Sequence, residues 1–174
     1  SVRTANWYLK HMRQFSRWLR RSGRSQHDEL EALELHAVTK EKHPRRALRD
    51  DEIEALLLAA ERGETFHGIS GPDRAEVYRL ALSTGLRANE IRTLTAGDFR
   101  IEGENRMVLV LSAENTKNRR AAEVELRADI AARMQKRIAG KAADERLFAL
   151  PDRTHDMIKV DLANAGVAYE TPEG

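Results

Sequence analysis

Arg87 stands at a point in the chain where its guanidinium could bind a phosphate. A helical, apolar stretch ends at Thr84-Gly85, and a second short helix with Glu90 in its first turn follows directly. Because the first N–H groups of a helix lack internal partners and the helix dipole is positive there, such a corner favours an anion. Glu90 is close enough to support the guanidinium or to cap the helix. The pattern predicts a phosphate site.

A continuous motif surrounds Arg87. It runs Thr84-Gly85-Leu86-Arg87-Ala88-Asn89-Glu90-Ile91-Arg92-Thr93-Leu94 and is followed by Asp98. This motif resembles the first catalytic box of the tyrosine recombinases, the phage integrase family, whose pattern is T-G-L-R-x-x-E-I-x-x-L-x-x-x-D. The resemblance implies that Arg87 is a catalytic arginine that neutralises phosphate oxygens, with Glu90 supporting it. The alternative is a local salt bridge that only caps a helix.

Lys117 is the second candidate for chemistry, because it lies on a polar tip between two strand-like segments. In tyrosine recombinases a lysine on such a hairpin is the general acid for the leaving 5′ oxygen, and the resemblance implies that role for Lys117. Arg119 and Arg120, on the same tip, are predicted to contact the DNA backbone. A solvent-exposed turn decorated with cations is the alternative.

The resemblance implies attack of a tyrosine hydroxyl on a DNA phosphodiester. This reaction gives a 3′-phosphotyrosyl link and a free 5′ hydroxyl, and it uses fixed cations with no metal or other cofactor. The family's His-x-x-Arg box and its nucleophilic tyrosine are not present in the right order. Tyr8, Tyr78 and Tyr169 are expected not to be the nucleophile. The chain is therefore interpreted as a fragment that binds DNA weakly and cleaves nothing.

A basic amphipathic helix is predicted near the N-terminus, over residues 4–22. Aromatic side chains fall on one side of it and cations on the other, with no carboxylate between Ser1 and His27. Charge of one sign attracts a polyanion, here double-stranded DNA, whereas the alternative is a solvated surface helix. The predicted DNA contacts of this helix are Lys10, Arg13, Arg17, Arg20, Arg21 and Arg24.

The expected fold is α+β and mainly helical, with helices around a small three-stranded antiparallel sheet. Further helices are predicted over 50–60, 72–84, 128–138 and 154–165, one helical turn around 28–35, and strands over 99–101, 107–111 and 123–126. The resemblance divides the chain into the last helix of an N-terminal core-binding domain (1–24), a linker (25–43) and the N-terminal portion of a catalytic domain (44–174).

Composition narrows the class of protein. The chain has 174 residues, a net charge of +2 and no cysteine, which excludes disulfides and thiolate metal sites. No apolar run is long enough to span a membrane, and no histidine spacing suggests a metal site. A cytoplasmic, nucleoid-associated protein is expected.

Three functions remain open at this point: part of a recombinase, a non-catalytic DNA-binding protein with the same fold, or a helical protein-interaction module. The first two predict DNA affinity that falls steeply with salt. The family resemblance implies that the parent oligomerises on DNA. Self-association is also expected, because apolar faces of the helices over 128–138 and 154–165 are expected to be left uncovered.

Overall fold

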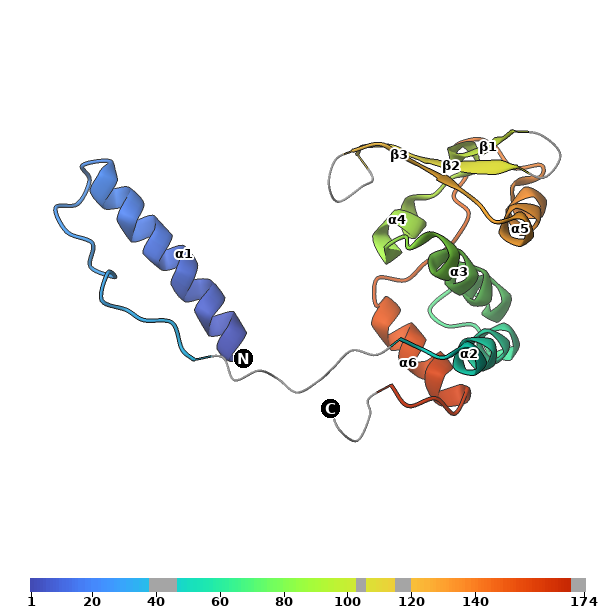
Figure 1. The fold of residues 1–174 in the computed structure, drawn as a ribbon, viewed down its shortest axis with the longest axis horizontal. Coiled ribbons are helices and arrows are strands. Elements are labelled where there is room, and N and C mark those ends of the chain that lie inside the picture. Colours follow the sequence, from blue (N-terminus) through green and yellow to red (C-terminus); the bar gives the residue numbers. More distant parts are fainter. Residues whose placement is uncertain (38–46, 103–105, 115–119, 170–174) are drawn as a thin grey trace. The chain divides into compact units, whose positions relative to one another are not determined.

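The computed structural model describes residues 1–37, 47–102, 106–114 and 120–169. The chain divides into two compact units. The first holds a single helix, α1, and the segment that follows it, and the second holds the remaining helices and the sheet (Figure 1).

Helix α1 spans Val2–Arg21, in agreement with the prediction of a helix over residues 4–22. It ends at Gly23, whose φ of 69° is a left-handed conformation that glycine adopts without strain. The Arg24 N–H donates to the Leu19 carbonyl at 2.9 Å and the Gly23 N–H donates to the Arg20 carbonyl at 3.1 Å. These two bonds form a Schellman motif, which satisfies the last carbonyls of the helix.

The segment 25–37 folds back along α1. The Asn6 amide donates to the His36 carbonyl and accepts from the His36 N–H, each at 2.9 Å. The Ser16 hydroxyl donates to the Asp28 carboxylate. The predicted helical turn around 28–35 is wrong: only hydrogen-bonded turns form there. Asp28 instead accepts from Ser16 and from the Leu30 N–H, bonds that compete with helix formation.

The aromatic side of α1 is exposed. Five large side chains on it have exposed fractions between 49% and 59%: Trp7, Tyr8, Met12, Phe15 and Trp18. Within this unit the described segment 25–37 therefore shields another side of the helix.

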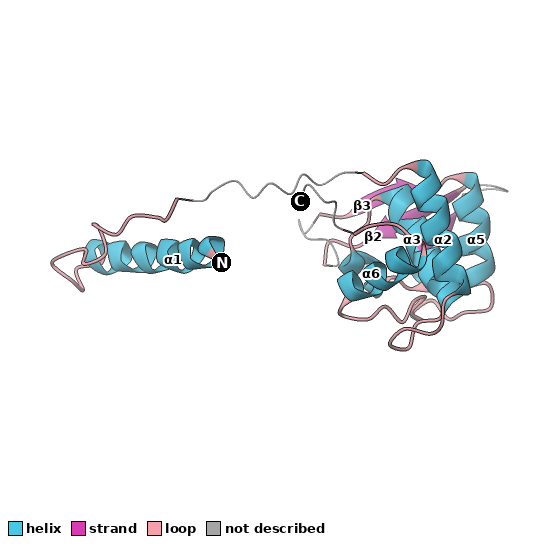
Figure 2. Ribbon diagram, turned by 90° about the horizontal axis from the view of Figure 1, so that it is seen from below, coloured by secondary structure: helices cyan, strands magenta, loops and turns pink. Residues whose placement is uncertain are grey.

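The second unit is mainly helical, as predicted. Helix α2 packs against α3 and α6, and α5 lies against α3 (Figures 1 and 2). The α-helices are α2 (Asp50–Arg62), α3 (Gly71–Thr84), α4 (Ala88–Thr93), α5 (Ala128–Ile138) and α6 (Thr154–Asn164), and the 3-10 helix η1 covers Ala96–Asp98.

The sheet is antiparallel with the order β1-β2-β3, as predicted. Its strands are β1 (Phe99–Ile101), β2 (Met107–Leu111) and β3 (Ala122–Glu125). Phe99 pairs with Leu109, and both side chains are buried against the helices. The outward side chains carry ion pairs, with Arg100 at 3.1 Å from Glu123. One face of the sheet thus closes the core and the other faces water.

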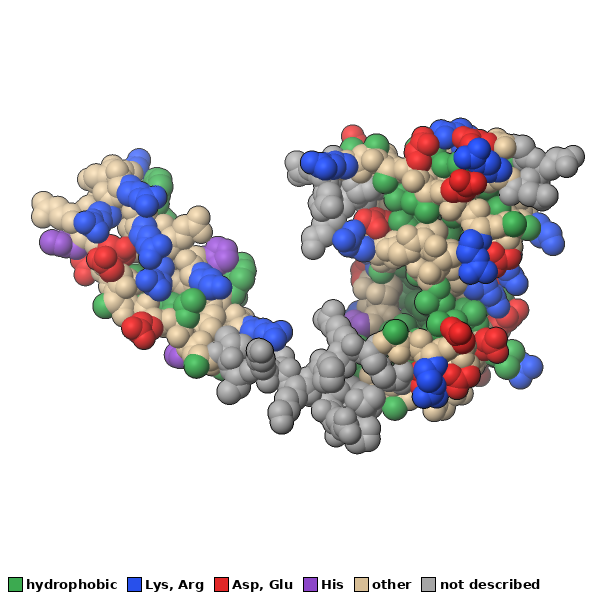
Figure 3. Space-filling view, in the orientation of Figure 1, with side chains coloured by type: hydrophobic (Ala, Val, Ile, Leu, Met, Phe, Trp, Pro, Cys, Tyr) green, Lys and Arg blue, Asp and Glu red, His purple; other side chains and the backbone are tan. Residues whose placement is uncertain are grey.

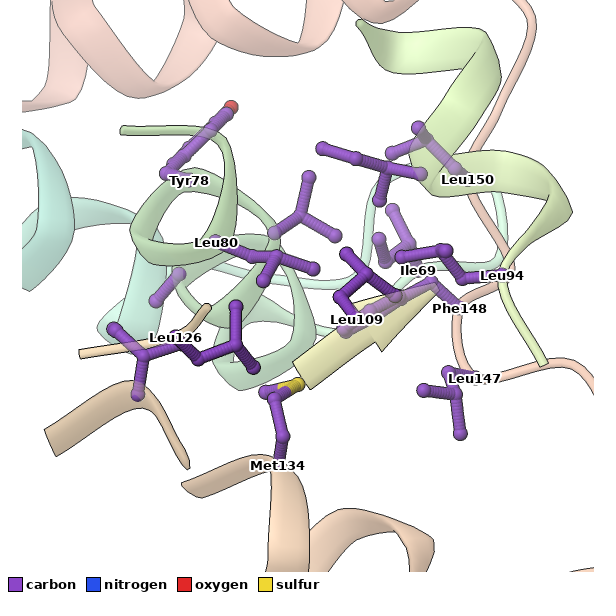
Figure 4. Close-up of a cluster of buried hydrophobic side chains, with 14 of the residues drawn as sticks. Ile69, Tyr78, Leu80, Leu94, Leu109, Leu126, Met134, Leu147, Phe148 and Leu150 are labelled. Atoms are coloured by element: carbon purple, nitrogen blue, oxygen red, sulfur yellow. The ribbon is translucent and has the colours of Figure 1, made fainter. Parts of the chain in front are cut away.

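The core joins helices and sheet. Leu80 of α3 and Leu109 of β2 are fully buried, and Met134 of α5 lies beside them (Figure 4). The expectation that α5 and α6 leave their apolar faces uncovered is wrong. Met134 on α5 and Met157 on α6 are only 1% and 2% exposed, because α5 packs on α3 and α6 packs on α2.

Candidate catalytic and nucleic-acid-binding site

Arg87 occupies the corner between α3 and α4. Gly85 ends α3 with a φ of 70°, and its N–H donates to the Ala81 carbonyl at 2.9 Å. A left-handed residue at this point turns the chain sharply, and glycine adopts it without cost. Arg87 is then the N-cap of α4 with extended backbone, and its side chain is 60% exposed. The turn thus presents the guanidinium to solvent.

Glu90 holds Arg87 twice. One carboxylate oxygen accepts from the Arg87 backbone N–H at 2.8 Å and the other accepts from Arg87 Nη1 at 3.2 Å. The Glu90 side chain is 7% exposed, so the carboxylate is fixed inside while the guanidinium reaches outward. Nε and Nη2 of Arg87 make no hydrogen bond to the described residues. Two donor nitrogens of the guanidinium therefore remain able to bind a ligand such as a phosphate.

The attraction for an anion comes mainly from Arg87. Helix α4 has only 6 residues, so its dipole adds little, and the predicted contribution of the helix N-terminus is smaller than that of the guanidinium.

Two predicted residues of the hairpin tip, Lys117 and Arg119, lie outside the described residues. Arg120 is described and exposed. In Figure 1, the end of the sheet where β2 ends and β3 begins lies on the same side of the second unit as α4. The roles predicted for these three residues remain predictions.

The cations of α1 are not all free of acidic neighbours. Arg17 Nε lies 3.9 Å from the Asp28 carboxylate and Arg20 Nη1 lies 4.0 Å from Glu31. Arg13 is half-buried and donates to the Glu31 carbonyl at 3.4 Å. Figure 3 shows acidic side chains beside the Lys and Arg side chains that run along this helix. The sequence alone missed this because the acids follow in the folded-back segment.

Two of the predicted cations of α1, Lys10 and Arg21, make no side-chain hydrogen bond or ion pair with the described residues. Arg24 lies over the Trp18 ring at 4.8 Å from its centroid, a cation–π contact that holds it against the aromatic side.

A buried ionic network in the second unit had no signal in the sequence. Arg74 of α3 donates from Nε and Nη2 to Asp161 of α6 at 2.9 and 3.0 Å, and the Tyr78 hydroxyl donates to the same carboxylate at 2.7 Å. Arg74 is 2% exposed and Asp161 is fully buried. The partners are far apart in the sequence, so only the packing of α6 reveals the pair.

The same network decides the chemistry of Tyr78. Burial and the hydrogen bond to Asp161 raise the pKa of its hydroxyl far above the ordinary value, so Tyr78 is a poor nucleophile. Tyr169 is half-exposed with the Lys159 ammonium 4.6 Å from its ring centroid. Tyr8 lies on the exposed side of α1.

Within residues 1–37, 47–102, 106–114 and 120–169, no cluster of His, Cys, Asp and Glu side chains could hold a metal ion. Across those same ranges, no helix has the length and apolar composition needed to cross a membrane.

Comparisons with known proteins identify relatives. The model of the phage integrase family matches residues 46–164. Tyrosine recombinase XerA of Saccharolobus solfataricus is 30% identical over 147 residues, which are 84% of this chain and 42% of that protein. The chain thus spans about two fifths of the length of this curated relative.

One solved structure shares the fold, and a second is a weaker match. The XerH site-specific recombinase, bound to its difH substrate in a pre-cleavage complex, has a TM-score of 0.54 and 19% identity, with 82% of this chain and 43% of that chain covered. The integrase from mycobacterium phage Brujita has a TM-score of 0.46 and 16% identity, with coverage of 98% and 54%.

Proposed function

Because the chain belongs to the phage integrase family, the tyrosine recombinases, we propose that it is part of a site-specific recombinase that breaks and rejoins double-stranded DNA. In this proposal residues 1–24 are the last helix of a core-binding domain, 25–43 are a linker, and 44–174 are the N-terminal portion of the catalytic domain. The family match over residues 46–164 and the separate compact unit that contains them support this division.

The observation that carries the proposal is the geometry of Arg87. Its guanidinium is 60% exposed, yet it is anchored at one nitrogen by a carboxylate that is itself buried. A cation fixed in this way costs little reorganisation when charge develops on a phosphate, which is how preorganised electrostatics accelerates phosphoryl transfer.

The proposed reaction is attack of a tyrosine oxygen on phosphorus, with departure of the 5′ oxygen as a hydroxyl. Arg87 neutralises the nonbridging oxygens and Glu90 positions Arg87. Lys117 protonates the leaving oxygen, and Arg119 and Arg120 contact the DNA backbone. We further propose that the whole recombinase oligomerises on its DNA, works in the nucleoid and needs no cofactor.

The test is formation of the covalent protein–DNA adduct by the recombinase that contains this chain. A nicked duplex carrying its recombination site traps the adduct, which is counted on denaturing gels. Arg87→Ala should lower the rate of adduct formation about 100-fold or more, because one preorganised donor at a developing anion contributes on that order. Arg87→Lys should also be slow, since an ammonium cannot reproduce the two free guanidinium donors.

Arg127→Ala is the matched control. Arg127 is in the same unit, is exposed like Arg87, and pairs only with the neighbouring Asp129 among the described residues. Its replacement should leave adduct formation at the wild-type rate. An unchanged rate in Arg87→Ala would reject Arg87 as a catalytic residue, and absence of any adduct in the wild-type recombinase would reject the assigned reaction.

A further inference from the structure

One stripe of α1 differs from the rest of its basic side. Lys10, Gln14, Arg17 and Arg21 follow at intervals of four, three and four residues, so they lie along one face of the helix. These side chains are exposed and line a shallow groove, together with Arg13 and Trp18. Figure 3 shows Lys and Arg side chains along the helix.

The folded-back segment 25–37 takes up the adjoining side of α1. Its Asp28 is 3% exposed, accepts from the Ser16 hydroxyl and lies near Arg17, and its Glu31 lies near Arg13 and Arg20. A duplex that approached from this side would meet the exposed Glu31 carboxylate. The described acids leave the sector of Lys10, Gln14 and Arg21 clear.

Gln14 is the uncharged polar side chain in a stripe of cations. It makes no hydrogen bond to the described residues. Lys10, Arg17 and Arg21 gain free energy from phosphates, but an amide gains little there. A glutamine amide instead matches the N6 donor and N7 acceptor of adenine in the major groove, whose width of about 12 Å admits one α-helix.

We infer that α1 enters the DNA major groove by the stripe Lys10–Gln14–Arg17–Arg21, in which Gln14 reads an adenine and the three cations contact flanking phosphates. This inference rests on the proposed DNA binding. It specifies the face of α1 that contacts DNA and the residue that determines the sequence preference. The stripe spans about 16 Å along the axis, which covers about five base pairs.

The first experiment measures sequence preference with the full chain. Double-stranded oligonucleotides from a random pool are selected and sequenced for wild type, Gln14→Ala and Gln14→Arg. Wild type should enrich a motif containing an adenine. Gln14→Ala should lose preference at that position alone, by about five- to 150-fold. Gln14→Arg should shift it to guanine, because arginine matches O6 and N7 of that base.

The second experiment tests which face of α1 contacts DNA. The affinity for a fixed duplex is followed by fluorescence anisotropy from 50 to 200 mM NaCl. Lys10→Ala and Arg21→Ala should each reduce the slope of log K against log salt by about 1, since each removes one phosphate contact. Arg127→Ala is the control: Arg127 is exposed, belongs to the second unit and pairs with the neighbouring Asp129. Its slope should stay that of wild type.

The outcomes separate the two proposals. No salt-dependent binding of any duplex by the full chain would reject DNA binding itself. Binding with an unchanged motif in Gln14→Ala, or with no motif in wild type, would reject the reading role of Gln14. Slopes in Lys10→Ala and Arg21→Ala equal to that of Arg127→Ala would reject the chosen face. The replacements on α1 are at exposed helical positions and alanine favours helix, so circular dichroism should show α1 intact.

Discussion

At the scale of single residues, one carboxylate positions the central cation of the site. Glu90 accepts from both the backbone and the side chain of Arg87. The two readings of the motif, a helix cap and a catalytic arginine, therefore do not compete: the same contact that caps α4 also fixes the direction of the guanidinium. The capping contact of Glu90 thus accounts for the start of α4 and for the orientation of the Arg87 side chain.

The buried pair of Arg74 and Asp161 makes a prediction at this scale. Asp161→Asn leaves a buried guanidinium without its counter-charge, which should lower the free energy of unfolding by about 3 to 5 kcal/mol. Urea unfolding followed by far-ultraviolet circular dichroism measures the loss. Arg74 also donates to the Glu64 carbonyl at 2.6 Å, so the cation is fixed and cannot turn to solvent.

A combined variant provides the comparison. Arg74→Met, Asp161→Leu and Tyr78→Phe together replace the whole network by apolar groups of similar size, so no charge is left buried. This variant should be more stable than Asp161→Asn alone. Two results would contradict the idea that the unpaired buried charge dominates the loss of stability. One is an Asp161→Asn variant as stable as wild type, and the other is a triple variant less stable than Asp161→Asn.

At the scale of elements, the N-terminal end of α3 is fixed by close backbone packing against α2. Arg87 follows the C-terminal end of α3. A Cβ added at Gly71 would lie 2.4 Å from the Gly63 carbonyl oxygen and 2.6 Å from that of Ala60. These are backbone atoms of α2 and its end, and they cannot move without shifting the helix. The close approach of α2 and α3 therefore requires glycine at this position.

Gly71→Ala should lower the free energy of unfolding by about 2 to 3 kcal/mol, as measured in urea. This is the upper part of the usual range for overpacking, because the added Cβ would meet backbone atoms. Gly68→Ala is the control: its φ is 86° but nothing lies within 4 Å of an added Cβ. Only local backbone strain of about 1 kcal/mol is expected there. A loss at Gly71 no larger than that at Gly68 would show that the α2–α3 contact adapts freely.

At the scale of the whole molecule, the two units should unfold separately. Both tryptophans of the chain, Trp7 and Trp18, lie on α1, whereas the buried core of the second unit is formed by residues 56–167. Tryptophan fluorescence therefore reports the first unit, and circular dichroism at 222 nm reports mainly the second. The first unit has few buried apolar side chains and should unfold at the lower urea concentration.

Two non-coincident transitions are the expected result. Deletion of residues 1–37 should leave the circular dichroism midpoint unchanged, because no described core residue of the second unit is removed. Coincident midpoints, or a midpoint lowered by the deletion, would show that the units stabilise one another. Self-association remains a prediction, and the exposed apolar surface that favours it lies on α1.

Local order was readable from the sequence alone. The Thr84-Gly85 stop, the run of strand-forming apolar residues in 107–111 and the acids at the start of α2 each act within a few residues, so α2, α3 and the antiparallel sheet were predicted correctly. The motif around Arg87 was readable for the same reason. The domain division and the roles of Lys117, Arg119 and Arg120 stay predictions.

The tertiary structure alone decided the contacts between distant segments. Asp28 and Glu31 lie beside cations that the sequence placed on an acid-free helix. Asp161 holds Arg74 and removes Tyr78 from consideration as a nucleophile. Residue type and spacing determine the backbone locally through sterics and capping, but the charge next to a side chain depends on which segments the hydrophobic core brings together.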